Sequence, residues 1–302
     1  MQDHSGRIAV DGLSKRFGTV EAVRDLGFTV EPGLVTGFLG PNGSGKTTTL
    51  RMILGLVVPT SGTALVEGVP FETLGSPGRV LGAVLEAQGF HPSRTARRHL
   101  LVCAAAIGVP DRRVDEVLGL VGLAADADRG VGGYSLGMKQ RLALATALLG
   151  DPRILVLDEP GNGLDPAGIA WLRDFLRGFA RSGRSVLVSS HQLAEIGQSA
   201  DRVVVIHRGA CVYQGELAGL GGGRRGRVLV RCAEPVTLAQ ALVAKGLMEV
   251  DTLPDGRLAV GGADAVLVGD TALAAGVAVY GLVEEQVDLE QLFLQLTGGV
   301  AG

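Results

Sequence analysis

A glycine-rich segment near residue 40 carries the residue types that bind phosphate. Residues 40–47 read Gly-Pro-Asn-Gly-Ser-Gly-Lys-Thr and fit the pattern G-x-x-x-x-G-K-[ST] completely. Glycines let the backbone curl so that several N–H groups point at phosphate oxygens, and a following helix adds its positive N-terminus. We expect Lys46 to serve the β- and γ-phosphates and the Thr47 hydroxyl to ligate Mg²⁺. The predicted nucleotide-binding residues are Gly40, Pro41, Asn42, Gly43, Ser44, Gly45, Lys46, Thr47 and Thr48.

Two acidic residues follow an apolar run at residues 154–157. Unpaired carboxylates are costly inside a core, so Asp158 and Glu159 at the carboxyl end of a buried strand are expected to face a site. Asp158 is placed to hold Mg²⁺ through water, and Glu159 to orient and deprotonate the attacking water. The alternative for this pair is a solvated strand end.

His191 follows another short apolar run, at residues 185–188. A histidine in that place is by itself more often structural. Beside the glycine-rich segment and the two acids, we predict instead that it contacts the γ-phosphate. Lys46, Glu159 and His191 are therefore the candidate catalytic residues.

The helices and strands predicted around these residues follow an α/β pattern. Nearly continuous apolar runs at residues 35–39, 80–85, 154–157, 185–188 and 203–206 are typical of strands buried on both faces of a parallel sheet. Helices are predicted between them, at residues 46–56, 167–181 and 192–199, and residues 100–149 also have a mostly helical composition. Residues 8–30 indicate short strands and turns.

The pattern changes after a glycine-rich stretch at residues 217–226, which has the composition of a flexible linker. The order β, α, β, β, α, β then predicts a small α+β domain of the ferredoxin-like kind. A last helix at residues 288–297 places Leu289, Leu292, Phe293 and Leu296 on one apolar face.

Composition limits the function classes. The 302 residues suit one large and one small domain, and 46% hydrophobic residues supply a sizeable core. A net charge of −3 does not call for a nucleic-acid partner. The three cysteines have no metal-ligand spacing and indicate reduced thiols of a cytoplasmic protein. Apolar runs are shorter than the ~18 residues a spanning helix needs, so work at a membrane would require another chain to cross it.

The order of these motifs resembles that of ATP-binding subunits of ABC transporters. Residues 134–141, Tyr-Ser-Leu-Gly-Met-Lys-Gln-Arg, resemble the signature of that family, and Asn162-Gly-Leu-Asp165 resembles its D-loop. Residues 58–62 also recur in such subunits, and Phe17 stands where an aromatic ring stacks on adenine. The resemblance covers residues 6–216. The ending at residues 288–298 resembles the C-terminal extension of bacterial drug- and antibiotic-export ATPases.

The resemblance implies a P-loop ABC ATPase domain at residues 1–216, with a RecA-like mixed sheet, an N-terminal antiparallel β subdomain and a helical subdomain at about 87–150. A linker at 217–226 and a C-terminal accessory domain at 227–302 follow. It further implies that two copies dimerise head to tail around two Mg-ATP and drive a separate membrane permease from the inner face of the cell membrane. Each ATP would be held by the phosphate loop of one copy and, from the other, by the signature residues Ser135, Leu136, Gly137 and Met138. Asp165 is the candidate site residue of the D-loop.

Two positions depart from the family pattern. Leu136 stands where a glycine is usual and adds bulk near phosphate. Glu86 aligns with the glutamine that faces the metal, although Gln88 lies two residues later. A glutamate still accepts from metal-bound water, so Glu86 joins Thr47 and Asp158 as a predicted metal residue.

Three other functions fit parts of the sequence. A soluble ABC protein acting on ribosomes or DNA would usually carry two nucleotide domains or a long coiled-coil insertion. A degenerate subunit would bind ATP only as a structural ligand, and Leu136 and Glu86 keep that alternative open. An unrelated P-loop kinase would not explain residues 134–141. Within the transporter hypothesis, export is favoured and import stays open.

Overall fold

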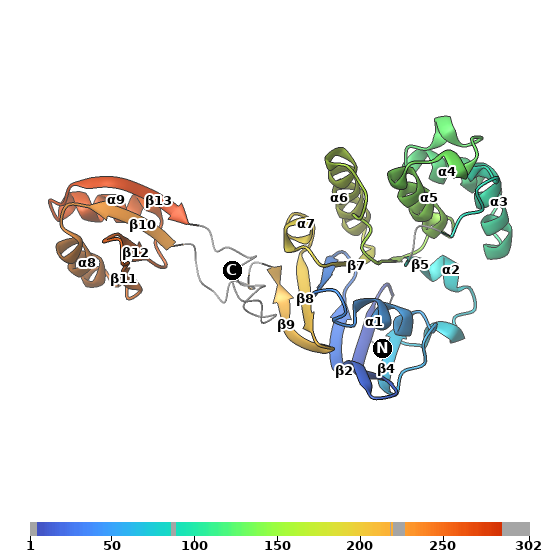
Figure 1. Cartoon of the computed structure of the whole chain (residues 1–302), viewed down its shortest axis with the longest axis horizontal. Coiled ribbons are helices and arrows are strands. Elements are labelled where there is room, and N and C mark those ends of the chain that lie inside the picture. Colours follow the sequence, from blue (N-terminus) through green and yellow to red (C-terminus); the bar gives the residue numbers. More distant parts are fainter. Residues whose placement is uncertain (1–4, 86–88, 218, 220–226, 286–302) are drawn as a thin grey trace. The chain divides into compact units, whose positions relative to one another are not determined.

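The computed structural model describes residues 5–85, 89–217, 219 and 227–285. The chain divides into two compact units, whose main spans are Met1–Leu217 and Ala218–Gln295 (Figure 1).

A mixed sheet forms the centre of the first unit. Among the described residues its six strands run in the order β5 (Leu81–Val84), β6 (Ile154–Leu157), β7 (Ser185–Ser190), β3 (Val35–Leu39), β8 (Arg202–His207) and β9 (Ala210–Glu216). The first five are parallel to their neighbours and β9 is antiparallel to β8. Strands β3, β6 and β7 are buried along their whole length, which confirms the predicted α/β class.

A second, antiparallel sheet pairs β1 (Ile8–Phe17) with β2 (Val20–Val30) and β4 (Ser61–Val66). The prediction of several short strands at residues 8–30 was wrong, because the segment is one long hairpin. Its alternation is interrupted by register shifts, and Gly12 (φ 57°) and Asp25 (φ 44°) have left-handed backbones. Phe28 of this sheet stacks on Phe38 of β3 with ring centres 5.3 Å apart, so the two sheets share a core.

Three of the described helices of the first unit begin at a side-chain cap. Thr95, Ser135 and Asp165 each accept a backbone N–H and start α3 (Ala96–Ile107), α5 (Leu136–Leu148) and α6 (Pro166–Arg181). The others are α1 (Lys46–Ile53), α2 (Pro77–Val80), α4 (Arg112–Leu120) and α7 (Leu193–Gly197). Helix α1 ends three residues earlier than predicted, because Gly55 turns left-handed (φ 67°) after the C-cap Leu54. Helices α3, α4 and α5 lie together beside β5 (Figure 1). In the described part of the chain, every helix is too short or too polar to span a membrane.

The second unit follows the predicted order of elements, in the sequence β10 (Arg227–Cys232), α8 (Pro235–Ala244), β11 (Val250–Thr252), β12 (Leu258–Val260), α9 (Ala265–Ala274) and β13 (Val279–Glu285). Its described strands pair antiparallel in the order β11-β12-β10-β13. Its own apolar cluster includes Val228, Leu242 and Val268. The predicted helix at residues 288–297 lies outside the described residues.

Candidate functional site

The glycine-rich segment joins β3 to α1, and two of its glycines lie where an added side chain would overlap neighbouring atoms of the chain. Gly45 has φ 106°, and a Cβ on it would lie 2.5 Å from the carbonyl oxygen of Ala22. A Cβ on Gly40 would lie 2.5 Å from both the Ile206 carbonyl oxygen and Ser44 Oγ. Ser44 Oγ is buried and has no hydrogen-bond partner among the described residues. The loop thus has the open backbone and an unsatisfied polar atom that a phosphate site requires.

Lys46, the first residue of α1, is 5% exposed and folds back over this loop. Its Nζ donates to the carbonyl oxygens of Gly40 (2.7 Å) and Pro41 (3.3 Å) and lies 3.3 Å from Glu159 Oε1. A buried ammonium group requires such partners. The geometry therefore brings the cation, the loop and an acid of β6 to one place.

Asp158 directly follows β6 and is held by two hydroxyl groups. Its Oδ2 accepts from Thr47 Oγ1 at 2.7 Å, and its Oδ1 accepts from Ser189 Oγ at the end of β7. Ser189 Oγ in turn accepts from the Glu159 N–H at 2.9 Å. These hard oxygen atoms at the carboxyl ends of adjacent parallel strands fit Mg²⁺, which Thr47 and Asp158 would hold.

Glu159 sits in a left-handed backbone conformation (φ 46°) that is costly for a non-glycine residue. Its Oε2 accepts from Asn162 Nδ2 at 2.8 Å and lies 3.0 Å from His191 Nδ1. Burial acts to raise the pKa of this carboxyl, but the Asn162 hydrogen bond and the charges of Lys46 and His191 together hold the pKa below its usual range. Glu159 is consequently ionised at neutral pH.

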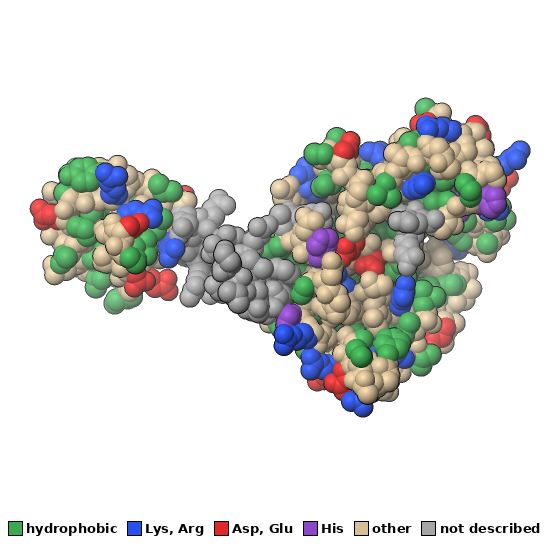
Figure 2. Space-filling view, in the orientation of Figure 1, with side chains coloured by type: hydrophobic (Ala, Val, Ile, Leu, Met, Phe, Trp, Pro, Cys, Tyr) green, Lys and Arg blue, Asp and Glu red, His purple; other side chains and the backbone are tan. Residues whose placement is uncertain are grey.

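Acidic and histidine side chains gather near the middle of the first unit on the face shown in Figure 2. The side chains of Glu159 and His191 are 21% and 31% exposed, so both reach the solvent. His191 also contacts Gln192, with its Nε2 3.3 Å from Gln192 Nε2. A nucleotide approaching the phosphate loop would meet both residues.

The signature residues lie on a different element, at the start of α5. Ser135 caps that helix, with its Oγ accepting from the Met138 N–H at 3.2 Å. The side chain of Leu136 packs on Gly163, where an added Cβ would lie 1.9 Å from Leu136 Cδ2. The Leu136 side chain, which stands where the family signature usually has a glycine, is therefore in contact with a glycine of the same chain.

Three other predicted site residues are Asp165, Phe17 and Glu86. Asp165 accepts from the Gly168 N–H at 2.7 Å and caps α6. Phe17 ends β1 and is 51% exposed, with Lys15 Nζ 5.0 Å from its ring centre. Glu86 lies outside the described residues, as does Gln88.

Sequence reasoning missed three polar side chains around the acids. Asn162 was noted only as part of the D-loop, yet it bonds Glu159, and Ser189 bonds Asp158. Gln140, on α5, donates to the Pro160 carbonyl oxygen at 3.3 Å. One signal in the sequence could have identified Ser189. It follows the apolar run at residues 185–188, at the same end of a predicted parallel strand as Asp158.

Similarity to known proteins identifies the family of the chain. A family model described as "ABC transporter" matches residues 23–162, and one described as "Domain of unknown function (DUF8746)" matches residues 226–290. The chain is 44% identical over 209 residues to the bacitracin transport ATP-binding protein of Bacillus licheniformis, covering 67% of each chain. It is 34% identical over 256 residues to the bacitracin transport ATP-binding protein of Enterococcus faecalis, covering 84% of this chain and 83% of that one.

A solved structure of an ATP-binding subunit of an ABC transporter is also similar. It has a TM-score of 0.64 and 28% sequence identity, covering 70% of this chain and 91% of that chain. Sequence relatives and fold thus lead to the same family. The chain belongs to the ATP-binding subunits of ABC transporters, which are ATPases whose hydrolysis is coupled to transport.

Proposed function

We propose that two copies of this chain close head to tail around two Mg-ATP and so drive a membrane permease. The single observation that carries the proposal is the convergence of Lys46, Asp158, Glu159 and His191 beside the phosphate loop, from α1 and the ends of β6 and β7. In this proposal residues 1–216 are the ATPase domain, 87–150 its helical subdomain, 217–226 a linker and 227–302 an accessory domain.

The proposed hydrolysis uses the residues as the geometry arranges them. The backbone N–H groups of the loop and Lys46 bind the phosphates. Mg²⁺, held by Thr47 and Asp158, neutralises charge on the phosphate oxygens when bound. Ionised Glu159 accepts a proton from the attacking water. His191, whose Nδ1 lies 3.0 Å from Glu159 Oε2, contacts the γ-phosphate.

The second half of each site comes, in this proposal, from the other copy. Helix α5 begins at Ser135, and its N-terminus carries a positive partial charge suited to a γ-phosphate across the interface. Neither copy then completes a site alone, so hydrolysis follows closure of the dimer. The permease spans the membrane, and this chain works at its inner, cytoplasmic face.

The proposed direction of transport is export of a peptide antibiotic or another amphipathic compound. It is supported by the relatives named for bacitracin transport and by another named for lantibiotic transport in Streptococcus pyogenes. Cells that lack this chain should become more sensitive to bacitracin or a lantibiotic. The natural chain should restore growth at the same antibiotic concentration, whereas Lys46→Ala should not. Unchanged sensitivity to both peptides would exclude them as cargo.

The hydrolytic part of the proposal is tested with Glu159→Gln. We expect this variant to bind ATP while its turnover falls by about 100-fold or more, since it loses the general base. Glu116→Gln, which changes a half-exposed glutamate on α4, is the matched control and should keep full turnover. Steady-state hydrolysis by Glu159→Gln at the natural rate would remove Glu159 from this role.

A further inference from the structure

One face of the signature helix lies against the segment that follows Glu159. Residues 136, 137, 140, 141 and 144 share this face, because their spacing is i, i+1, i+4, i+5 and i+8. Leu136 contacts Gly163, and a Cβ on Gly137 would lie 3.3 Å from Leu164 Cδ2. The N-terminal part of α5 thus contacts the segment that follows Glu159.

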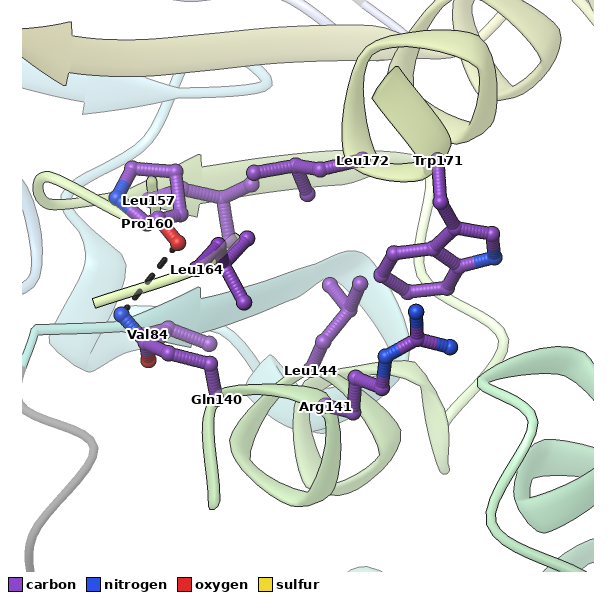
Figure 3. Close-up of a pocket in the computed structure, with 9 residues that line it drawn as sticks. All are labelled: Val84, Gln140, Arg141, Leu144, Leu157, Pro160, Leu164, Trp171 and Leu172. Atoms are coloured by element: carbon purple, nitrogen blue, oxygen red, sulfur yellow. Dashed lines mark hydrogen bonds between the residues drawn. The ribbon is translucent and has the colours of Figure 1, made fainter. Parts of the chain in front are cut away.

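A small cavity remains between them, as Figure 3 shows. Its lining is mostly apolar and comes from β5, α5, β6 and α6, including Val84, Leu144, Leu157 and Leu172. Apolar packing that leaves a cavity does not fix the position of one element on another as closely as a filled core does. The polar contacts at this cavity therefore matter more for the position of α5.

Gln140 makes the polar contact nearest the catalytic residues. Its Nε2 donates to the carbonyl oxygen of Pro160 at 3.3 Å, drawn as the dashed line in Figure 3. Its Oε1 is buried and has no hydrogen-bond partner among the described residues. The side-chain amide of Gln140 thus directs its N–H toward the Pro160 carbonyl group, directly after Glu159. Its own oxygen is left without a hydrogen bond among the described residues.

Arg141 forms the second contact. Its guanidinium lies over the Trp171 ring of α6, 4.2 Å from the ring centre, and Nη1 donates to the Val121 carbonyl oxygen at 3.0 Å. This contact links α5 to α6. Gln140 is the residue of this pair that reaches the backbone beside Glu159.

We infer that Gln140 is a positioning residue that couples the signature helix of each copy to the catalytic glutamate of the same copy. Ser135 and Gln140 belong to one rigid helix, and the Glu159 backbone is held in a costly conformation (φ 46°) one residue from Pro160. When the signature docks on the ATP of the partner, Gln140 sets Glu159 in its own site. This inference rests on the proposed head-to-tail dimer.

The test separates coupling within a copy from coupling across the dimer. Gln140→Met keeps the length of the side chain but removes its donor, and Gln140→Lys restores a donor. We expect Gln140→Met to lower kcat about tenfold with KM within about twofold, and Gln140→Lys to recover most of kcat. Gln240→Met, at an exposed site on α8, is the matched control and should keep the natural rate. Combined with Glu159→Gln, Gln140→Met should still form the ATP-dependent dimer.

Mixed dimers then decide which site Gln140 serves. Natural copies mixed with a large excess of the double variant Glu159→Gln, Gln140→Met should hydrolyse ATP as fast as natural copies mixed with excess Glu159→Gln. Gln140→Met copies mixed with excess Glu159→Gln should be about tenfold slower.

Three results would overturn the inference. They are an unchanged kcat in Gln140→Met, no recovery in Gln140→Lys, or the reverse order of rates in the two mixtures. If Gln140→Met does not fold, the rate of Gln140→Lys decides alone, because a donor-retaining variant slower by tenfold or more contradicts the inference. The absence of any ATP-dependent dimer in Glu159→Gln itself is a separate result, which overturns the proposed shared site.

Discussion

At the scale of single residues, the site is organised around one ionised carboxyl. Glu159 contacts Lys46 through one carboxylate oxygen and Asn162 and His191 through the other, and together these groups outweigh the effect of burial on its pKa. A general base of depressed pKa is fully available at neutral pH, although it is a weaker base for the same reason. The lower basicity of Glu159 is compensated by its position, because the same contacts fix where the carboxylate lies.

The depressed pKa predicts a pH dependence of stability in the nucleotide-free chain. Because the pKa of Glu159 is lower in the folded than in the unfolded state, its contribution to the free energy of unfolding is complete above the unfolded value, about 4.3, and is lost as the pH falls through the folded pKa. The advantage of the natural chain over Glu159→Gln should therefore shrink on acidification. Urea unfolding of both chains between pH 7 and about pH 3 measures it.

Asn162→Ala supplies the control for this prediction. The substitution removes one of the groups that lower the pKa of Glu159. The single variant Asn162→Ala is compared with the double variant Asn162→Ala, Glu159→Gln over the same pH range. The pH-dependent difference in stability within this pair should be smaller than that between the natural chain and Glu159→Gln. In the natural background, a difference that stays constant with pH, or grows toward acid, would contradict the assigned direction.

At the scale of elements, the signature helix and the segment after β6 are matched to each other. Leu136 needs the space left by Gly163, which also has a left-handed backbone (φ 77°). Gly163→Ala should lower the free energy of unfolding by about 1 kcal/mol for the backbone alone, and by a further ~1 kcal/mol because the 44% exposed Leu136 side chain must leave its present rotamer.

Gly183→Ala isolates the backbone cost of that substitution. Gly183 has a similar φ of 84°, but an added Cβ there meets nothing within 4 Å. It should therefore cost only about 1 kcal/mol. Adding Leu136→Ala to Gly163→Ala should recover part of the loss in a double-mutant cycle. Equal costs for Gly163→Ala and Gly183→Ala would show that Leu136 does not occupy this space.

Local sequence signals predicted the parts of the fold that are themselves local. The phosphate loop and the buried strands depend on neighbouring residues, so pattern and glycine placement identified them. The long hairpin at residues 8–30 was not predicted, because its bulges break the alternation of buried and exposed residues that marks a strand. The roles of Ser189 and Gln140 were not predicted for another reason. Their hydrogen-bond partners, Asp158 and Pro160, lie 31 and 20 residues away in the sequence and come close only through the strand order and helix packing.

At the scale of the whole molecule, the chain contains two units with separate cores. The first holds the phosphate loop and the acids, and the second has its own sheet and apolar cluster. Separate cores allow separate unfolding. The nucleotide site described here uses residues of the first unit.

Two thermal transitions are therefore expected in calorimetry, and Mg-ATP should raise only that of the first unit. At ATP concentrations about 100 times Kd the stabilisation is about 2.7 kcal/mol, or roughly 5–10 °C for a unit of this size. The same scan on Lys46→Ala should show no shift. A single cooperative transition, or equal shifts of two, would mean that the units fold as one body.

The shared nucleotide site is tested by the mass of purified Glu159→Gln in solution, measured by light scattering with and without Mg-ATP. We expect a monomer without nucleotide and a dimer with it, because each ATP needs the phosphate loop of one copy and the Ser135 helix of the other. The double variant Lys46→Ala, Glu159→Gln should stay monomeric. A Glu159→Gln chain that binds ATP in equilibrium dialysis and yet remains a monomer would contradict the shared site.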